Sequence, residues 1–299
     1  MTAGRRSALR AALILVAAAC FAPVMVAQAA ESVKTVRVGD MTVRYRESGP
    51  QAGPPVVLLH GGGLTSDMWR PLARAAADGG FRVYSMETRN HGGTDNPDGL
   101  FGYELLAADL EGFLVALDIR KPMVVGYSDG AIIAQAWLLG QPGRAQAAGL
   151  GGATHRIAAD AHYMDGLKVF YDYDRRGALP DRALDALVVS RPEFAARLKA
   201  LHATPEEPER WRRLHQRAWP TWTTRRVTPL RAYRAVEVPT LVIMGEADEF
   251  FLVRDAADLA DALPRGELAI IPGTGHSAFR DKAAIFNMMV IDFLKRSSQ

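Results

Sequence analysis

The residue best suited to chemistry is Ser128, at the centre of the segment Gly126-Tyr127-Ser128-Asp129-Gly130. This G-x-S-x-G pattern follows an apolar run that ends at Val125 and precedes a helix-like run that begins at Ala131. A strand, a tight turn and a helix in this order form a nucleophile elbow, which exposes the serine hydroxyl beyond the sheet. Small neighbours are needed there, because the strained turn brings backbone segments close together. The alternative is a glycine-rich turn with a surface serine.

A second glycine-rich turn, His60-Gly61-Gly62-Gly63, follows an apolar run of residues 55–59. A turn of this type supplies one backbone amide to an oxyanion hole, and the residue after the nucleophile supplies the other. We therefore predict Gly62 and Asp129 as the two donors, with Gly61 and Gly63 as alternatives to Gly62. The alternative without a function is a flexible turn between a strand and a helix.

An acid and a base follow two further apolar runs. Residues 240–244 lead into Gly245-Glu246-Ala247-Asp248-Glu249, and residues 268–272 lead into Gly273-Thr274-Gly275-His276. A serine hydroxyl needs an adjacent base to become a nucleophile, and an acid orients that base. The chain order serine, acid, histidine therefore predicts a triad of Ser128, Asp248 and His276. Other candidates remain: Glu246 and Glu249 for the acid, and His60, His91 and His155 for the base.

The elements that must position these residues alternate between buried strands and helices, which indicates an α/β fold with a mostly parallel central sheet flanked by helices. We expect an antiparallel pair at residues 33–38 and 42–46, then strands at 56–60, 82–86, 123–127, 147–151, 241–245 and 268–271. Helices are expected near 69–77, 103–117, 130–139, 253–263 and 282–295.

The stretch between the predicted strands at residues 147–151 and 241–245 is charged and rich in arginine and tryptophan. A structureless loop of that length is improbable in a domain, so residues 157–235 are expected to form a helical cap. The core then consists of residues 30–156 and 236–299. Six cap aromatics are candidates for cap packing and for an apolar pocket wall: Tyr163, Phe170, Tyr171, Trp211, Trp219 and Trp222.

The first 29 residues read as a signal peptide. Three arginines (Arg5, Arg6, Arg10) precede a mostly apolar segment, and Ala27-Gln28-Ala29 fits a signal-peptidase site. We therefore expect an exported protein, periplasmic or secreted, with no stable membrane span after cleavage. The twin arginines also resemble a folded-protein export signal, and Cys20 offers a lipoprotein alternative.

Charge and composition exclude several classes of function. The formal net charge of +3 falls to zero once the three arginines of residues 1–29 are removed, so no nucleic-acid partner is indicated. Cys20 is the only cysteine, which leaves the mature chain no thiol nucleophile and no disulfide. The sequence carries no metal-ligand or dinucleotide-binding pattern, so we expect no metal and no cofactor. The expected partner is a small-molecule substrate, and no oligomeric state is predicted.

From about residue 33 to residue 294 the chain resembles the α/β-hydrolase family. The segments that carry the resemblance are the nucleophile elbow, the glycine-rich turn of residues 60–63, Gly245 to Asp248, and Gly275-His276. Within it, the elbow and the acid segment look most like valacyclovir hydrolase and related bacterial serine esterases. Residues 87–94 resemble the family's D-x-R-G-x-G-x-S turn, with Glu87, Asn90 and Thr94 departing from it. We interpret that loop as structural support. The resemblance also disfavours haloalkane dehalogenases and epoxide hydrolases, which carry aspartate where Ser128 stands.

The sequence therefore predicts an enzyme, a serine hydrolase that cleaves a carboxylic ester of a small or medium, largely apolar substrate. Carbon-carbon bond, lactone or peracid chemistry on the same triad is the enzymatic alternative, since it requires the same motifs. In the valacyclovir-hydrolase group the aspartate after the nucleophile is associated with a substrate amino group, so Asp129 adds an amino-acyl ester or amide as a further hypothesis. A ligand-binding receptor with this fold is the non-enzymatic alternative.

Overall fold

Eight strands form the central sheet of the computed structural model, which describes residues 31–158, 161–173 and 175–299. Their spatial order is β1-β2-β4-β3-β5-β6-β9-β10. β1 (Ser32–Val38) pairs antiparallel with β2 (Met41–Ser48), β2 pairs antiparallel with β4, and every other neighbouring pair in this sheet is parallel. The remaining strands are β3 (Pro55–Leu59), β4 (Arg82–Met86), β5 (Met123–Tyr127), β6 (Ala147–Gly151), β9 (Thr240–Gly245) and β10 (Gly266–Ile271).

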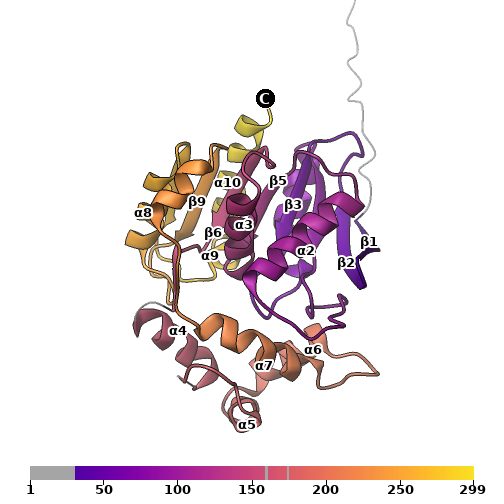
Figure 1. The fold of residues 1–299 in the computed structure, drawn as a ribbon, viewed down its shortest axis with the longest axis vertical. Coiled ribbons are helices and arrows are strands. Elements are labelled where there is room, and N and C mark those ends of the chain that lie inside the picture. The colour runs from indigo at the N-terminus through magenta and orange to yellow at the C-terminus, as the bar shows by residue number, and fades with distance from the viewer. Residues whose placement is uncertain (1–30, 159–160, 174) are drawn as a thin grey trace, which may run out of the picture.

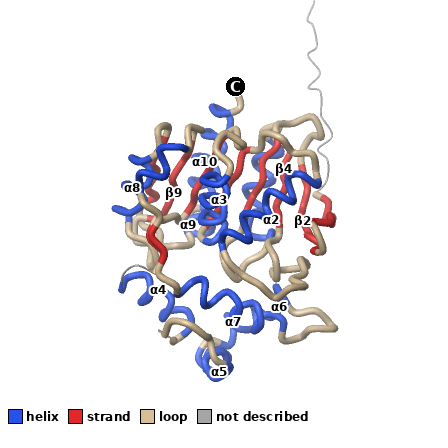
Figure 2. The backbone as a smooth tube through the Cα atoms, viewed as in Figure 1, coloured by secondary structure: helices blue, strands red, loops and turns tan. Residues whose placement is uncertain are grey.

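Helices cover both faces of this sheet (Figures 1 and 2). Alternate residues of a strand point to opposite faces. In β3, Val56 and Leu58 pack in the layer that contains α1 and α10, whereas Val57 and Leu59 pack in the layer that contains α2, α3 and α8. The helices are α1 (Arg70–Asp78), α2 (Tyr103–Ala116), α3 (Asp129–Gly140), α8 (Val253–Ala262) and α10 (Ala283–Ser297), with the shorter η1 (Ser66–Trp69) and α9 (Ala278–Asp281).

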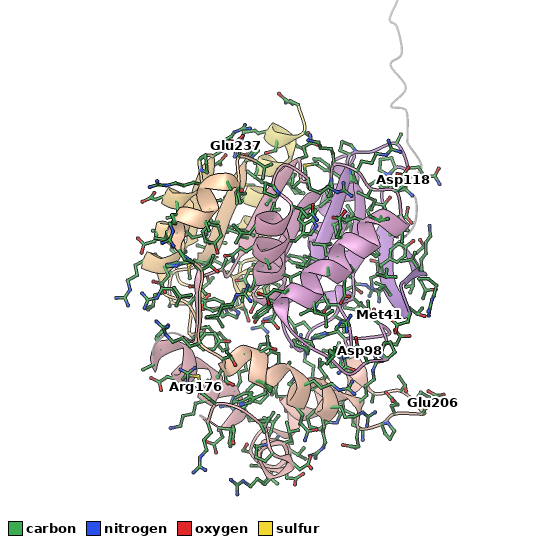
Figure 3. All side chains as sticks on the ribbon, in the orientation of Figure 1. Met41, Asp98, Asp118, Arg176, Glu206 and Glu237 are labelled. Carbon is green, nitrogen blue, oxygen red and sulfur yellow. The ribbon has the colours of Figure 1, made fainter. Side chains whose placement is uncertain are left out.

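Four further helices gather at one end of the sheet, below it in the view of Figure 1. They are α4 (Ala161–Tyr171), α5 (Asp181–Ser190), α6 (Pro192–His202) and α7 (Arg210–Thr223). A short antiparallel pair, β7 (Arg156–Ile157) with β8 (Arg226–Val227), joins the two chain segments that lead into and out of this layer. We call α4 to α7 the cap. Figure 3 labels Asp98 on the core loop that borders the cap, and Glu206 at the outer end of the cap loop between α6 and α7.

The predicted fold class is confirmed, and each predicted strand and helix of the core is present within a few residues of its predicted bounds. The last segment of the predicted cap range, residues 157–235, lies against the core. The 3₁₀ helix η2 (Leu230–Ala235) contacts α8 and α3 of the core, because Tyr233 is buried and donates a hydrogen bond to Gln135 at 2.6 Å.

The predicted signal peptide, residues 1–29 with Cys20, lies outside the described residues. Within the described part of the chain, no helix has the length and apolar character needed to cross a membrane.

Candidate active site

Ser128 occupies the tight turn between β5 and α3, with φ 55° and ψ −120°. A positive φ is costly for a residue with a Cβ, and such strain persists only where the surroundings enforce it. The serine amide donates to Gly151 O at 2.8 Å, which ties the turn to β6. A Cβ on Gly126 or Gly130 would collide with backbone oxygen of Gly130 or Leu59, respectively. The Ser128 side chain makes no helix-capping bond, so its hydroxyl is available for other contacts.

The three predicted triad residues form one hydrogen-bonded chain. His276 Nε2 lies 3.0 Å from Ser128 Oγ, and His276 Nδ1 lies 2.8 Å from Asp248 Oδ2. The other oxygen of Asp248 accepts hydrogen bonds from the amides of Phe250 and Phe251, at 2.9 and 3.0 Å. Both carboxylate oxygens are thereby fixed, and the buried acid holds the imidazole with its lone pair toward the serine.

The other acids at the end of β9 have separate partners. Glu249 accepts a hydrogen bond from the backbone amide of His276 at 2.6 Å, and Glu246 accepts one from the amide of Gly273 at 3.0 Å. Both carboxylates therefore bind backbone of the loop that carries His276, and neither contacts its imidazole in the described structure.

The three other candidate histidines lie apart from the serine. His60 and His91 are buried behind the glycine turn, with ring centroids 4.7 Å apart. His155 faces the cap exit, where its Nδ1 lies 3.3 Å from Thr228 O. His155 also groups with Asp255 and Asp258, their ligand atoms within 4.8 Å of one another. Arg156 and Arg254 both lie 3.9 Å from Asp255, so two arginine side chains already supply positive charge beside this acidic group.

The glycine turn leaves one amide free beside Ser128. Gly61 N lies 3.4 Å from the sulfur of Met68, and Gly63 N donates to His91 Nε2 at 3.2 Å. Among these three glycines of the described chain, only Gly62 has an amide without a partner. A backbone amide that stabilises a developing oxyanion must have no other hydrogen-bond acceptor before the reaction. Of the three, the Gly62 amide is therefore the one available to such an oxygen, and the Asp129 amide lies at the first turn of α3.

The carboxylate of Asp129 is buried and held by two neutral donors. Tyr103 Oη donates to Oδ1 at 2.8 Å, and Trp222 Nε1 on the cap donates to Oδ2 at 2.6 Å. Burial raises the pKa of Asp129 above its usual value, although the bonds from Trp222 and Tyr103 oppose that shift. Sequence reasoning gave Asp129 a backbone role at the oxyanion hole and, as a further hypothesis, a role toward a substrate amino group, but it did not anticipate Tyr103 or Trp222 as partners of the carboxylate.

A mostly apolar cavity lies over Ser128, between the sheet and the cap. The glycine turn, Ser128, Asp129 and His276 line its floor. Of the six cap aromatics proposed from the sequence, four line its wall, and Trp211 and Trp219 are buried in cap packing instead. The cap side chains in the wall include Tyr163, Leu167, Phe170, Tyr171, Leu198 and Trp222.

The model of the alpha/beta hydrolase family matches residues 56–287. The chain belongs to this family. A non-heme chloroperoxidase of Streptomyces lividans is 26% identical over 275 residues, which cover 87% of this chain and 99% of that protein. The 2-hydroxy-6-oxononadienedioate/2-hydroxy-6-oxononatrienedioate hydrolase of Paraburkholderia xenovorans is 28% identical over 302 residues, covering 89% of this chain and 96% of that one.

Among solved structures, the enol-lactonase of Burkholderia xenovorans has a TM-score of 0.65 and 23% identity, covering 88% of this chain and all of that one. This likeness concerns the fold. The named relatives of this hydrolase differ in their chemistry, and the narrower resemblance to valacyclovir hydrolase is not confirmed by them.

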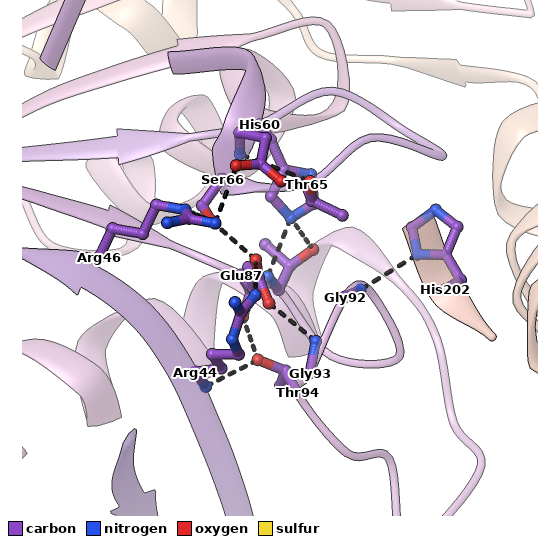
Figure 4. A network of polar contacts seen from close by, with 12 residues as sticks. Arg44, Arg46, His60, Thr65, Ser66, Glu87, Gly92, Gly93, Thr94 and His202 are labelled. Carbon is purple, nitrogen blue, oxygen red and sulfur yellow. Dashed lines mark hydrogen bonds and ion pairs between the residues drawn. The ribbon is translucent and has the colours of Figure 1, made fainter. Parts of the chain in front are cut away.

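The loop of residues 87–94 forms a polar network around Glu87 (Figure 4), and its His91 accepts a hydrogen bond from Gly63 N of the glycine turn. Glu87 accepts hydrogen bonds from Gly93 N at 2.8 Å, Ser66 Oγ at 2.7 Å and Arg44 Nη1 at 2.6 Å. Burial pushes the pKa of Glu87 upward, but these bonds outweigh it and leave the pKa below its usual value. The glutamate therefore ties Gly93 of its own loop to Ser66 and Arg44.

Four buried histidines make the stability of the fold sensitive to acid. Burial lowers the pKa of His60, takes that of His91 well below 6.5, and brings those of His202 and His215 to about 3 and about 4. Between pH 6.5 and these lowered values the unfolded chain binds more protons than the folded one. Stability must then fall as the pH drops through this window.

We expect the free energy of unfolding to decrease from pH 7 to pH 4.5, by up to about 1.4 kcal/mol per pH unit for each such histidine. Urea unfolding at a series of pH values measures it. The His215→Phe variant, which removes one titrating ring, should show a shallower slope than the natural chain. A free energy of unfolding that is constant or rises toward pH 4.5 would contradict the prediction.

Proposed function

We propose that this chain is a serine hydrolase that cleaves a carboxylic ester of a small or medium, largely apolar substrate through an acyl-enzyme on Ser128. The observation that carries the proposal is the continuous hydrogen-bonded chain from Asp248 through His276 to Ser128 Oγ, at 2.8 and 3.0 Å. The apolar cavity above it supports the choice of an apolar substrate.

The geometry fits a two-step acyl transfer. Ser128 Oγ attacks the ester carbonyl while His276 Nε2 takes its proton, and the carbonyl electron pair moves onto the oxygen. Collapse of this intermediate expels the alcohol, which takes the proton from His276. Water then attacks the acyl-enzyme by the same route and releases the acid. The amides of Gly62 and Asp129, with the positive end of α3, stabilise the oxyanion, and one such donor typically contributes about 100-fold to 1000-fold.

A fluorophosphonate probe and an ester panel test this function. We expect covalent labelling at Ser128, its loss in the His276→Ala variant, and turnover of short and medium p-nitrophenyl acyl esters. Lactones and vinylogous 1,5-diketones in the same panel test the lactone and carbon-carbon bond alternatives that the relatives suggest. A folded protein that the probe does not label would favour the receptor alternative and overturn the proposal.

Asp129 supports a second candidate, an amino-acyl ester or amide. Its buried carboxylate lines the cavity next to Ser128, where it could bind a substrate ammonium group. Matched esters with and without an α-amino group distinguish the candidates. The amino-acyl candidate requires a faster reaction of the amino ester and a loss of that preference in Asp129→Asn. Equal rates for the two esters would remove it and leave the plain ester function in place.

A further inference from the structure

Both backbone polar groups of Gly63 bind imidazole rings. Its N–H donates to His91 Nε2 at 3.2 Å, and its carbonyl accepts from His202 Nε2 at 3.0 Å. His91 lies on the core loop behind the glycine turn, whereas His202 is the last residue of α6 in the cap. The turn that carries the free Gly62 amide is thus held by a core residue on one side and by a cap residue on the other.

The partners of His202 define its hydrogen-bonding state. An amide N–H only donates and a carbonyl only accepts. Because Gly92 N donates to His202 Nδ1 at 3.1 Å (Figure 4), the ring proton must reside on Nε2, which donates to Gly63 O. The ring is 1% exposed, and burial lowers its pKa to about 3, so it stays neutral at physiological pH. A single neutral tautomer therefore bridges two core loops from the cap.

The Gly62 amide gains its direction from the residues around it. The carbonyl of its own peptide group, Gly61 O, accepts from Leu64 N at 3.1 Å and lies 2.9 Å from His60 Nδ1. The following residue, Gly63, has φ 66°, a conformation that a glycine enters and leaves easily. Without a fixed partner for Gly63 O, the turn could relax and tilt the Gly62 amide away from Ser128.

We propose that His202 is a positioning residue of the active site, which through Gly63 fixes the direction of the Gly62 amide. Docking of the cap then completes the oxyanion hole as well as covering the substrate. The inference rests on the proposed acyl-transfer function and adds to it a dependence of the chemical step on a cap residue. His202 does not line the substrate cavity, so its effect is expected on kcat and not on substrate binding.

Isosteric substitutions separate the two bonds of His202. The side-chain nitrogen of glutamine can approach the position of Nε2 and keep the donor to Gly63, whereas the oxygen of asparagine matches Nδ1 and keeps only the bond from Gly92. We expect His202→Asn to lower kcat about 10-fold to 100-fold with KM within about 3-fold, because a donor misplaced by about 1 Å can cost 100-fold. His202→Met, which lacks both bonds, should behave like His202→Asn. His202→Gln should retain most of kcat.

Thr221→Val provides the matched control. Thr221 is a cap residue on α7 whose Oγ1 donates to the core at Phe101 O, 3.4 Å away, so the variant loses a cap-to-core hydrogen bond without touching Gly63. We expect its kcat to stay near that of the natural chain. Thermal unfolding of all four variants shows whether a loss of kcat follows the loss of the donor to Gly63 or only a loss of stability.

Two readouts complete the test: steady-state hydrolysis of a p-nitrophenyl ester, and the rate of fluorophosphonate labelling, in which the P=O group occupies the oxyanion position. His202→Asn should slow both. The inference is wrong if this variant keeps its kcat and labelling rate, if glutamine is as damaging as asparagine, or if only KM changes. In each case the natural chain would still hydrolyse esters, so the proposed function would stand. A natural chain that neither hydrolyses esters nor reacts with the probe would overturn both.

Discussion

We expect the kcat of His276→Ala for ester hydrolysis to be about 10⁴-fold to 10⁶-fold lower than that of the natural chain, and the kcat of Ser128→Ala to be lowered by about the same factor. His276 Nε2 is the only side-chain base within hydrogen-bond reach of Ser128 Oγ in the described structure, at 3.0 Å. Without it the serine keeps its proton at neutral pH and is a poor nucleophile. The two losses should not add in the double variant, because the residues act as one unit. Steady-state rates with a p-nitrophenyl ester measure each loss.

His162 gives the matched control for that experiment. Its Nε2 also lies beside the acid, 3.1 Å from Asp248 O, but it contacts the backbone carbonyl and not the carboxylate. We expect His162→Gln to keep kcat within a few-fold of the natural chain. A His276→Ala protein that is folded by circular dichroism and retains more than about 1% of kcat would refute the assignment of the base.

The sequence was sufficient to predict the sheet and the meeting of Ser128, Asp248 and His276 for a local reason. Each strand of the parallel sheet is a short apolar run bounded by turn residues, and the reactive residues follow such runs directly. Ser128, Asp248 and His276 therefore needed no knowledge of packing beyond the rule that parallel strands end at one edge. The same rule put Gly62 next to them, but could not choose it over Gly61 and Gly63. That choice needed the partners of the other two amides, Met68 and His91.

What the sequence could not reveal depends on how the cap docks. His202 binds Gly63 and Gly92 across 139 and 110 residues of chain, and Trp222 binds Asp129 across 93 residues. Helical periodicity shows that both residues lie on buried faces, but not which core group each face meets. One signal was present: His202 and His215 are polar residues at apolar positions of α6 and α7, and a buried polar side chain requires a partner.

Asp248→Asn tests the orienting role of the acid with little change in shape. Oδ1 of Asp248 accepts from the Phe250 and Phe251 amides, and asparagine can keep both bonds with its own oxygen. Its NH₂ group must then occupy the position of Oδ2, 2.8 Å from His276 Nδ1. Because that group donates, Nδ1 must accept, and the ring proton moves to Nε2. The base then faces Ser128 with a proton instead of a lone pair.

We therefore expect Asp248→Asn to lower kcat about 10⁴-fold while KM and the thermal unfolding temperature change little. Glu246→Gln is the matched control. Glu246 is a rival acid at the same strand end, but in the described structure its carboxylate accepts a hydrogen bond from Gly273 N, so the kcat of this variant should be nearly unchanged. Raising the pH should not rescue Asp248→Asn, because the wrong tautomer of a neutral ring has no proton to lose in the accessible range. If Glu246→Gln or Glu249→Gln caused the larger loss instead, the acid of the relay would be misassigned, and the hydrogen bond between Asp248 and His276 would have only a structural role.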